Sequence, residues 1–195
     1  MQQQVSLFIE YLKQSIVLTN HEESLLVSQI SYRKYLKGQY LLQQGDTCRF
    51  FNFITSGTTK TFHIDNEGNE HIFRFAIENW WATDLSSFIN QEISNTNIQC
   101  LRDTEVVQIS LQDLEKLYLE IPQLEHFFRI LFQKVSITLE KRIINNLSLS
   151  AKKKYLLFQE EYPEFEQRIP QYMIASYLGI SKQYLSEIRN QLISS

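Results

Sequence analysis

Cysteine and glycine are both scarce in this chain of 195 residues, which contains two cysteines and five glycines. Cys48 and Cys100 lie far apart and form no CxxC pair, so neither a disulfide framework nor a zinc site of paired cysteines is indicated. The glycines stand at turns between short apolar runs, and no G-x-S-x-G, P-loop or G-x-G-x-x-G pattern is present. These absences argue against an enzyme with a serine nucleophile or a glycine-rich phosphate loop.

Long apolar runs are also missing, since none approaches the roughly 18 residues that a membrane-spanning helix needs. The opening MQQQVSLFIEYLKQ lacks the basic start and the cleavage site of a secretory signal, so we expect a cytoplasmic protein with no membrane partner. Four histidines, with no H-x-H pair, and two isolated cysteines are poor material for a metal, haem or iron–sulfur site. We therefore expect no metal and no cofactor.

Aromatic residues are abundant, with 13 Phe and 10 Tyr, and 43% of the chain is hydrophobic, which is enough for a packed core. The net charge of -3 excludes a protein that coats nucleic acid without selectivity. From Ser150 to the end, six positive residues stand against five negative ones, so this segment is the least acidic part of the chain. A local nucleic-acid footprint is compatible with that balance.

The hydrophobic period changes twice along the chain. Two amphipathic helices are predicted in the first thirty residues, the second starting at Thr19 and Asn20. About eight short strands follow between Arg33 and Ser110, separated by turns. Helical periodicity then returns, first after a capping-box-like start at Ser110 and then in a long helix over residues 123–147. Another helix ends near Pro163.

The long helix carries an apolar stripe that is too broad for one partner. We interpret it as the seam of a homodimer, resembling a short coiled coil. Packing against the helix's own domain is the alternative. The predicted seam residues are Leu124, Phe128, Leu131, Val135 and Leu139.

The segment QYMIASYLGISKQYLSEIRNQL is typical of two helices joined by a tight turn. Gly179 suits a left-handed turn, and Ser181 suits the cap of the following helix. The positions that build such a pair are occupied throughout, by Ile174, Ala175, Leu178, Gly179, Leu185 and Ile188. The pattern therefore predicts a helix-turn-helix, with an ordinary helical hairpin as the alternative.

Residues after the cap would face outward and enter a major groove. Lys182 suits a guanine edge or a phosphate, and Gln183 can pair with adenine, although a solvated surface is the other interpretation. The predicted DNA-binding residues are Gln171, Ser181, Lys182, Gln183, Tyr184, Ser186, Glu187 and Arg189.

These features together resemble the Crp/Fnr superfamily of bacterial transcription regulators. The resemblance rests on the glycine-bounded stretch Gly38 to Asp46, the FITSG strand and turn, and ASYLGISKQYLSEIR, and it covers nearly the whole chain. The ENWW stretch, Glu78 to Trp81, is similar to that of a compact subgroup. The resemblance implies an α+β chain with a double-stranded β-helix (a cupin-like jelly roll), dimerisation through the long helix and winged-helix DNA binding.

Three parts are expected from this resemblance. Residues 1–121 would form the cyclic-nucleotide-binding-like sensor with flanking helices, 122–148 the dimerisation helix and 149–195 the helix-turn-helix domain. Only seven residues follow Ile188, so we expect a truncated wing and DNA binding that weakens steeply with salt. Glu187 stands where the family often places an arginine that pairs with guanine, which predicts either weaker binding or a different base preference.

The sensor departs from the members that bind cyclic nucleotides. Their GEL turn and RS pair align with Thr83-Asp84-Leu85 and Ser94-Asn95, and the arginine that neutralises the phosphate is absent. Arg102 is the nearest arginine in sequence and would have to be re-aimed. We expect a degenerate pocket around Thr83, Asp84, Leu85, Ser94, Asn95 and Thr96 that does not bind cyclic AMP tightly.

The sequence therefore favours a homodimeric regulator that binds a palindromic stretch of double-stranded DNA, with an unknown small-molecule effector and RNA polymerase as further candidate partners. The alternative is a dimeric small-molecule-binding or interaction module that has lost DNA affinity. An enzyme on the β-roll is the least favoured reading, because the metal-ligand spacing is missing.

Overall fold

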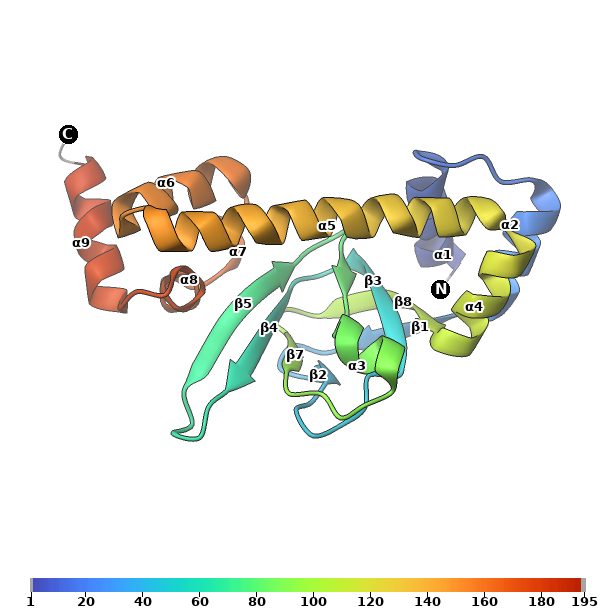
Figure 1. Cartoon of the computed structure of the whole chain (residues 1–195), viewed down its shortest axis with the longest axis horizontal. Coiled ribbons are helices and arrows are strands. Elements are labelled where there is room, and N and C mark those ends of the chain that lie inside the picture. The colour runs from blue at the N-terminus through green and yellow to red at the C-terminus, as the bar shows by residue number, and fades with distance from the viewer. Residues whose placement is uncertain (1, 194–195) are drawn as a thin grey trace.

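The computed structural model describes residues 2–193, which form a β-rich unit, one long helix and a group of short C-terminal helices (Figure 1). Helices α1 (Gln2–Lys13) and α2 (Asn20–Gln29) come first. The Thr19 hydroxyl accepts a hydrogen bond from the Glu22 amide, and the Glu22 carboxylate accepts one from the Thr19 amide. This capping box pairs two amides that the first turn would leave unpaired, and it confirms the predicted start of the second helix.

Eight strands follow among the described residues, in agreement with the predicted number, although the first begins three residues early. They form two antiparallel four-stranded sheets, ordered β1-β8-β3-β6 and β2-β7-β4-β5. Strand β5 is therefore an edge of the second sheet. The bounds are β1 (Ile30–Tyr35), β2 (Tyr40–Leu42), β3 (Phe50–Ser56), β4 (Thr59–Ile64), β5 (Glu70–Ala76), β6 (Trp81–Ala82), β7 (Asn97–Cys100) and β8 (Thr104–Ser110).

A short helix, α3 (Leu85–Asn90), interrupts the strands where none was predicted. Asp84 caps it by accepting a hydrogen bond from the Ser87 amide at 3.3 Å, and Gln91 ends it in the left-handed conformation. Six residues are too few for the sequence to show a helical period, so the cap was the only signal.

The main core combines buried side chains of both sheets with those of the helices that pack on them. Phe8 of α1 packs against Phe53 and Trp81, and Phe51 and Trp81 both contact Phe128 of the long helix. Helix α4 (Leu111–Glu120) begins where expected, with the Ser110 hydroxyl accepting from the Asp113 amide at 3.1 Å.

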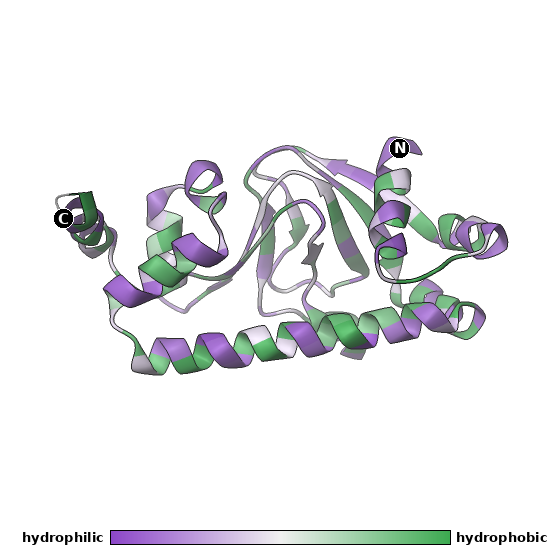
Figure 2. Ribbon diagram, turned by 90° about the horizontal axis from the view of Figure 1, so that it is seen from above, coloured by the Kyte–Doolittle hydropathy of each residue, from purple (hydrophilic) through white to green (hydrophobic). Residues whose placement is uncertain are grey.

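The long helix α5 (Pro122–Ser148) runs beside the β-rich unit and continues to the C-terminal helices (Figure 2). Its first turns belong to the main core, since Leu124 and Phe128 are only 1% and 2% exposed. These two residues of the predicted dimer seam therefore pack inside their own chain, which is the alternative that the breadth of the stripe had left open. Leu131 is half-buried against the same core, while Val135 and Leu139 are exposed.

Four helices follow: α6 (Ala151–Glu161), α7 (Phe165–Arg168), α8 (Gln171–Leu178) and α9 (Lys182–Ile193). Gly179 ends α8 with a φ of 69°, in the region that favours glycine, and the Ser181 hydroxyl accepts from the Tyr184 amide at 3.1 Å. Both features of the predicted turn are thus confirmed. The side chains expected between the two helices are buried, namely Ile174, Ala175, Leu178, Leu185 and Ile188.

A second core joins the C-terminal helices to the β-rich unit. Phe62 of β4 and Ile72 and Phe75 of β5 share it with Phe158 of α6 and Ile174 of α8. Both cysteines are free and buried, and burial raises the pKa of Cys100 to about 11. No helix within residues 2–193 is long and apolar enough to cross a membrane.

Candidate nucleic-acid interface and the joint behind it

The outer face of α9 displays most of the residues predicted to contact DNA. All are exposed except Arg189, which is half-buried; Gln171 lies apart from the others, at the start of α8. The Ser181 hydroxyl serves as the helix cap, so it is already engaged with the backbone. The remaining exposed residues are Lys182, Gln183, Tyr184, Ser186 and Glu187.

The charge of this face is nearly balanced. Arg189 forms an ion pair with Glu166 at 3.3 Å, and the same carboxylate accepts hydrogen bonds from the Tyr155 hydroxyl and Gln159. Arg189 is thereby tied to α7. Lys182 and Glu187 oppose one another in charge, so the cationic character that usually supports phosphate contacts is weak here.

The predicted ligand-pocket residues divide into two groups. The Asp84 carboxylate accepts hydrogen bonds from the Ser94 hydroxyl at 2.7 Å and the Thr96 hydroxyl at 3.3 Å, so these three side chains lie together. Among the described residues, the side chains of the other three form no hydrogen bond with the Asp84 carboxylate. The Thr83 hydroxyl accepts from the Asn52 amide, the Asn95 carbonyl accepts from the His63 ring, and Leu85 is exposed.

A cation that the sequence alignment missed lies beside this cluster. Arg74 of β5 donates to the Thr83 carbonyl at 3.4 Å. Burial and the nearby Arg142 lower the pKa of the Arg74 guanidinium, and Asp84 opposes this shift. Arg102, the nearest arginine in sequence, instead donates to the Gln167 carbonyl at 3.5 Å. A lone arginine among the apolar residues of its strand was the only sequence signal for Arg74.

Arg142 of α5 connects the β-rich unit to the C-terminal helices. Its guanidinium donates to the Phe73 carbonyl of β5 and, at 3.1 Å, to the Tyr177 carbonyl near the end of α8. It also lies over the Tyr177 ring, 3.9 Å from the centroid, which is close enough for a cation–π interaction. One side chain of α5 therefore contacts two other elements, β5 and α8.

Ser176 of α8 closes the exposed edge of β5. Its hydroxyl accepts from the Ile72 amide at 3.2 Å and donates to the Glu70 carbonyl at 3.1 Å. An edge strand carries unpaired amides and carbonyls, and α8 satisfies two of them here. The C-terminal helices are thus held by polar bonds as well as by the second core.

The ENWW stretch contacts the C-terminal helices through Glu78 and Trp80 and the main core through Trp81. Glu78 forms an ion pair with Arg168 of α7 and accepts from the Gly57 amide at 3.0 Å. Trp80 contacts Tyr162 and Phe165, whereas Trp81 points into the main core. Burial disfavours the Glu78 carboxylate, but its hydrogen bonds outweigh that cost, so the pKa of Glu78 lies below its ordinary value. The ion pair is therefore present at neutral pH and is lost as the pH falls through that lowered pKa.

We call Arg142, Ser176, Glu78, Trp80 and their partners the joint. The sequence shows that these residues are present but gives no sign of the contact, because each partner lies far away along the chain. No group of three or more His, Cys, Asp or Glu side chains suited to a metal occurs within residues 2–193.

Comparisons with known proteins show what this chain is similar to in sequence and in fold. Residues 32–120 match the cyclic nucleotide-binding domain family. The transcriptional activator protein Anr of Pseudomonas protegens is 26% identical over 181 residues, covering 84% of this chain and 72% of that protein. Among solved structures, FixK2 from Bradyrhizobium japonicum superposes with a TM-score of 0.72 at 14% identity, covering 85% of each chain. A regulator of the Crp/Fnr family from Eubacterium rectale gives a TM-score of 0.68 at 15% identity, covering 91% of this chain and 85% of its own.

Hydrogen exchange of the Ile72 amide tests the contact between α8 and β5. Replacing Ser176 by alanine leaves the Ile72 amide without its acceptor, so we expect this amide to exchange about tenfold faster, the equivalent of about 1.4 kcal/mol. Hydrogen exchange followed by NMR measures it. Ser136→Ala, on the exposed face of α5, is the control and should leave Ile72 unchanged. Equal exchange at Ile72 in both variants would show that α8 does not protect β5 in solution.

Proposed function

We propose that the chain is a transcription regulator of the Crp/Fnr superfamily rather than an enzyme, and that it acts as a homodimer that binds palindromic DNA through the outer face of α9. The observation that carries this proposal is the pairing of α8 and α9. The Gly179 turn and the Ser181 cap bury Leu185 and Ile188, and they leave the polar side of α9 exposed. These features support a helix-turn-helix whose second helix would enter a major groove.

The proposal assigns a part of the chain to each task. Residues 1–121 act as the sensor, built as a double-stranded β-helix, residues 122–148 dimerise, and residues 149–195 bind DNA. Lys182 and Gln183 contact base edges or phosphates, while Tyr184 and Ser181 contact phosphate oxygens of the DNA. A small-molecule effector and RNA polymerase are further partners in this scheme. The competing function is a dimeric binding module without DNA affinity, which the balanced charge of α9 favours.

DNA binding separates the two functions. The dimer should shift a palindromic fragment with half-sites one helical turn apart, taken from the region upstream of its own gene. Lys182→Ala should weaken this binding by about tenfold, and raising the salt from low to physiological should weaken it steeply. Electrophoretic shift measures both. Exposed Lys116 on α4 provides the control, because Lys116→Ala makes the same charge change far from α9. Binding that ignores salt and Lys182 would favour the binding module.

The role of Glu187 follows from the same assay. Glu187→Arg that tightens binding to every sequence would show that the carboxylate weakens phosphate attraction. Lost discrimination at one base pair would show that it accepts a hydrogen bond from cytosine.

The dimer seam is proposed for the exposed half of α5. Val135, Leu139, Ile143 and Leu147 recur every four residues, and their exposed fractions rise from 38% to 84% along the helix. Exposing such an apolar stripe to water is unfavourable in free energy. The same helix of a second copy would bury it by packing against it. Leu124 and Phe128 take no part in it, because they are buried within their own chain.

Introducing a charge into this stripe should break the dimer. We expect Leu139→Glu to elute as a monomer in size-exclusion chromatography at micromolar concentration, with an unchanged circular dichroism spectrum. Gln133→Glu adds the same charge to an exposed position of α5 outside the stripe, so it should remain dimeric. A Leu139→Glu dimer as stable as the wild type would place the seam elsewhere.

The sensor pocket is proposed to exclude cyclic AMP because it already contains an anion. The Asp84 carboxylate occupies the hydroxyl donors of Ser94 and Thr96, and Arg74 is the neighbouring cation. A nucleotide phosphate placed here would meet a carboxylate and too few free donors. Arg74 is already compensated in charge by the Asp84 carboxylate, so desolvating a second anion beside it is unfavourable.

Calorimetry checks this exclusion. Wild-type protein should bind cyclic AMP with a Kd no tighter than about 1 mM. Asp84→Ser keeps a helix cap but removes the carboxylate, so it should bind the nucleotide more tightly than the wild type does. Micromolar binding by the wild type, lost on changes between Asp84 and Thr96, would contradict the proposal.

A further inference from the structure

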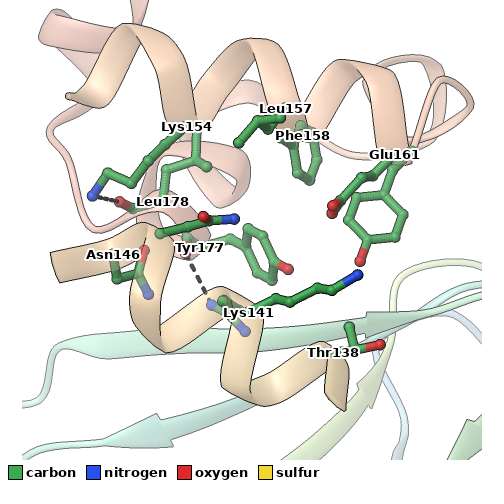
Figure 3. Close-up of a pocket in the computed structure, with 12 residues that line it drawn as sticks. Thr138, Lys141, Asn146, Lys154, Leu157, Phe158, Glu161, Tyr177 and Leu178 are labelled. Carbon is green, nitrogen blue, oxygen red and sulfur yellow. Dashed lines mark hydrogen bonds between the residues drawn. The ribbon is translucent and has the colours of Figure 1, made fainter. Parts of the chain in front are cut away.

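A cavity of about 330 Å³ lies between α5, α6 and the end of α8, at some distance along the chain from the sensor pocket (Figure 3). We call it the junction cavity. Helix α6 supplies Lys154 and Phe158 on one side, and α5 supplies Lys141 and Asn146 on the other. It belongs to neither the outer face of α9 nor the Asp84 cluster. Its walls come from the helix that leaves the sensor and from the helices that would bind DNA.

The junction cavity is electropositive. Three cations line it, Lys141, Arg142 and Lys154, against a single carboxylate, that of Glu161. Arg142 is committed to the joint, but the Lys154 ammonium uses one of its three hydrogens, donating to the Leu178 carbonyl at 3.2 Å. Within residues 2–193, the side-chain amides of Asn145 and Asn146 form no hydrogen bond. The cavity is thus lined by two side-chain amides that form no hydrogen bond within the described residues and by a Lys154 ammonium with hydrogens left to donate.

The remaining wall is apolar and aromatic. Phe158 and Leu178 are buried, and Leu157, Tyr162 and Tyr177 are half-buried. Burial raises the pKa of Tyr177, so its hydroxyl stays neutral and adds no negative charge to the wall. In Figure 3, Glu161 lies toward one end of the cavity, and Lys154 and Asn146 lie toward the other. Lys154 and Asn146 are thus separated from the opposing charge along the length of the cavity, whereas Lys141 extends toward the Glu161 end.

We propose that the junction cavity binds a small organic anion, with its phosphate or carboxylate group at Lys154 and Asn146 and a ring portion against Phe158 and Tyr177. The volume suits a molecule of metabolite size, and a few polar groups on an apolar wall are typical of small-molecule sites. Binding there would connect α5 to α6 and α8, so a ligand selective for this arrangement would stabilise the joint. This site goes beyond the proposed DNA binding, and its test involves no DNA.

Four probes define the ligand chemistry: phenyl phosphate, benzoate, inorganic phosphate and benzyl alcohol. NMR titration of the full chain should give a Kd of about 1 mM or tighter for phenyl phosphate or benzoate. The stronger of the two identifies the anionic group. Inorganic phosphate lacks the ring and benzyl alcohol lacks the charge, so each should bind at least about tenfold more weakly. Equal binding of inorganic phosphate would reject the built site and leave a general surface attraction.

Three variants locate the site. Asn146→Asp adds a negative charge at the proposed anionic end and should weaken binding about tenfold. Glu161→Gln removes the opposing charge and should strengthen binding about threefold. Gln133→Glu is the matched control, since it adds the same charge as Asn146→Asp on the same helix but outside the cavity. An effect of Asn146→Asp no larger than that of Gln133→Glu, or no binding of either aryl anion at about 10 mM, would overturn the proposal.

Discussion

The contact made by the Arg142 guanidinium is the interaction on which the arrangement of this chain depends. It starts from α5, reaches a carbonyl of edge strand β5 and a carbonyl near the end of α8, and lies over the Tyr177 ring. The carbonyl end of a helix carries partial negative charge, so a guanidinium is well matched to α8 there. The Ser176 hydroxyl adds hydrogen bonds between the same two elements, β5 and α8, and the Glu78–Arg168 ion pair extends the contact to α7.

Apolar packing makes the same connection less specific but stronger. Phe62, Ile72 and Phe75 belong to the sheet, yet their neighbours in the second core come from α6, α7 and α8. A change in the position of the β4–β5 pair therefore changes the surface against which α8, the helix before the Gly179 turn, packs. The sensor and the proposed DNA-binding helices are not connected through α5 alone, and the junction cavity lies where the two connections meet.

Local features of this fold could be predicted from the sequence because their causes are local. The Thr19 and Ser110 caps, the Gly179 turn and the number of strands each depend on residues a few positions apart. The burial of Phe128 and the position of Arg74 next to Thr83 depend on residues that lie far away along the chain. Periodicity shows that a helix face is apolar but not which residues pack against it. Aligning the nucleotide-binding motifs with residues 83–95 cannot identify a cation such as Arg74, which lies on another strand. The joint was invisible for the same reason.

Helix α5 is anchored at its start in the main core and meets the joint near its end. Its 27 residues span about 40 Å at the rise of an α-helix. Phe128 and Arg142 lie 14 residues apart on this helix, which is about 21 Å at that rise, so a tilt of about 5° around Phe128 displaces Arg142 by about 2 Å. A displacement of about 2 Å is enough to break the hydrogen bond of Arg142 with the Phe73 carbonyl of β5.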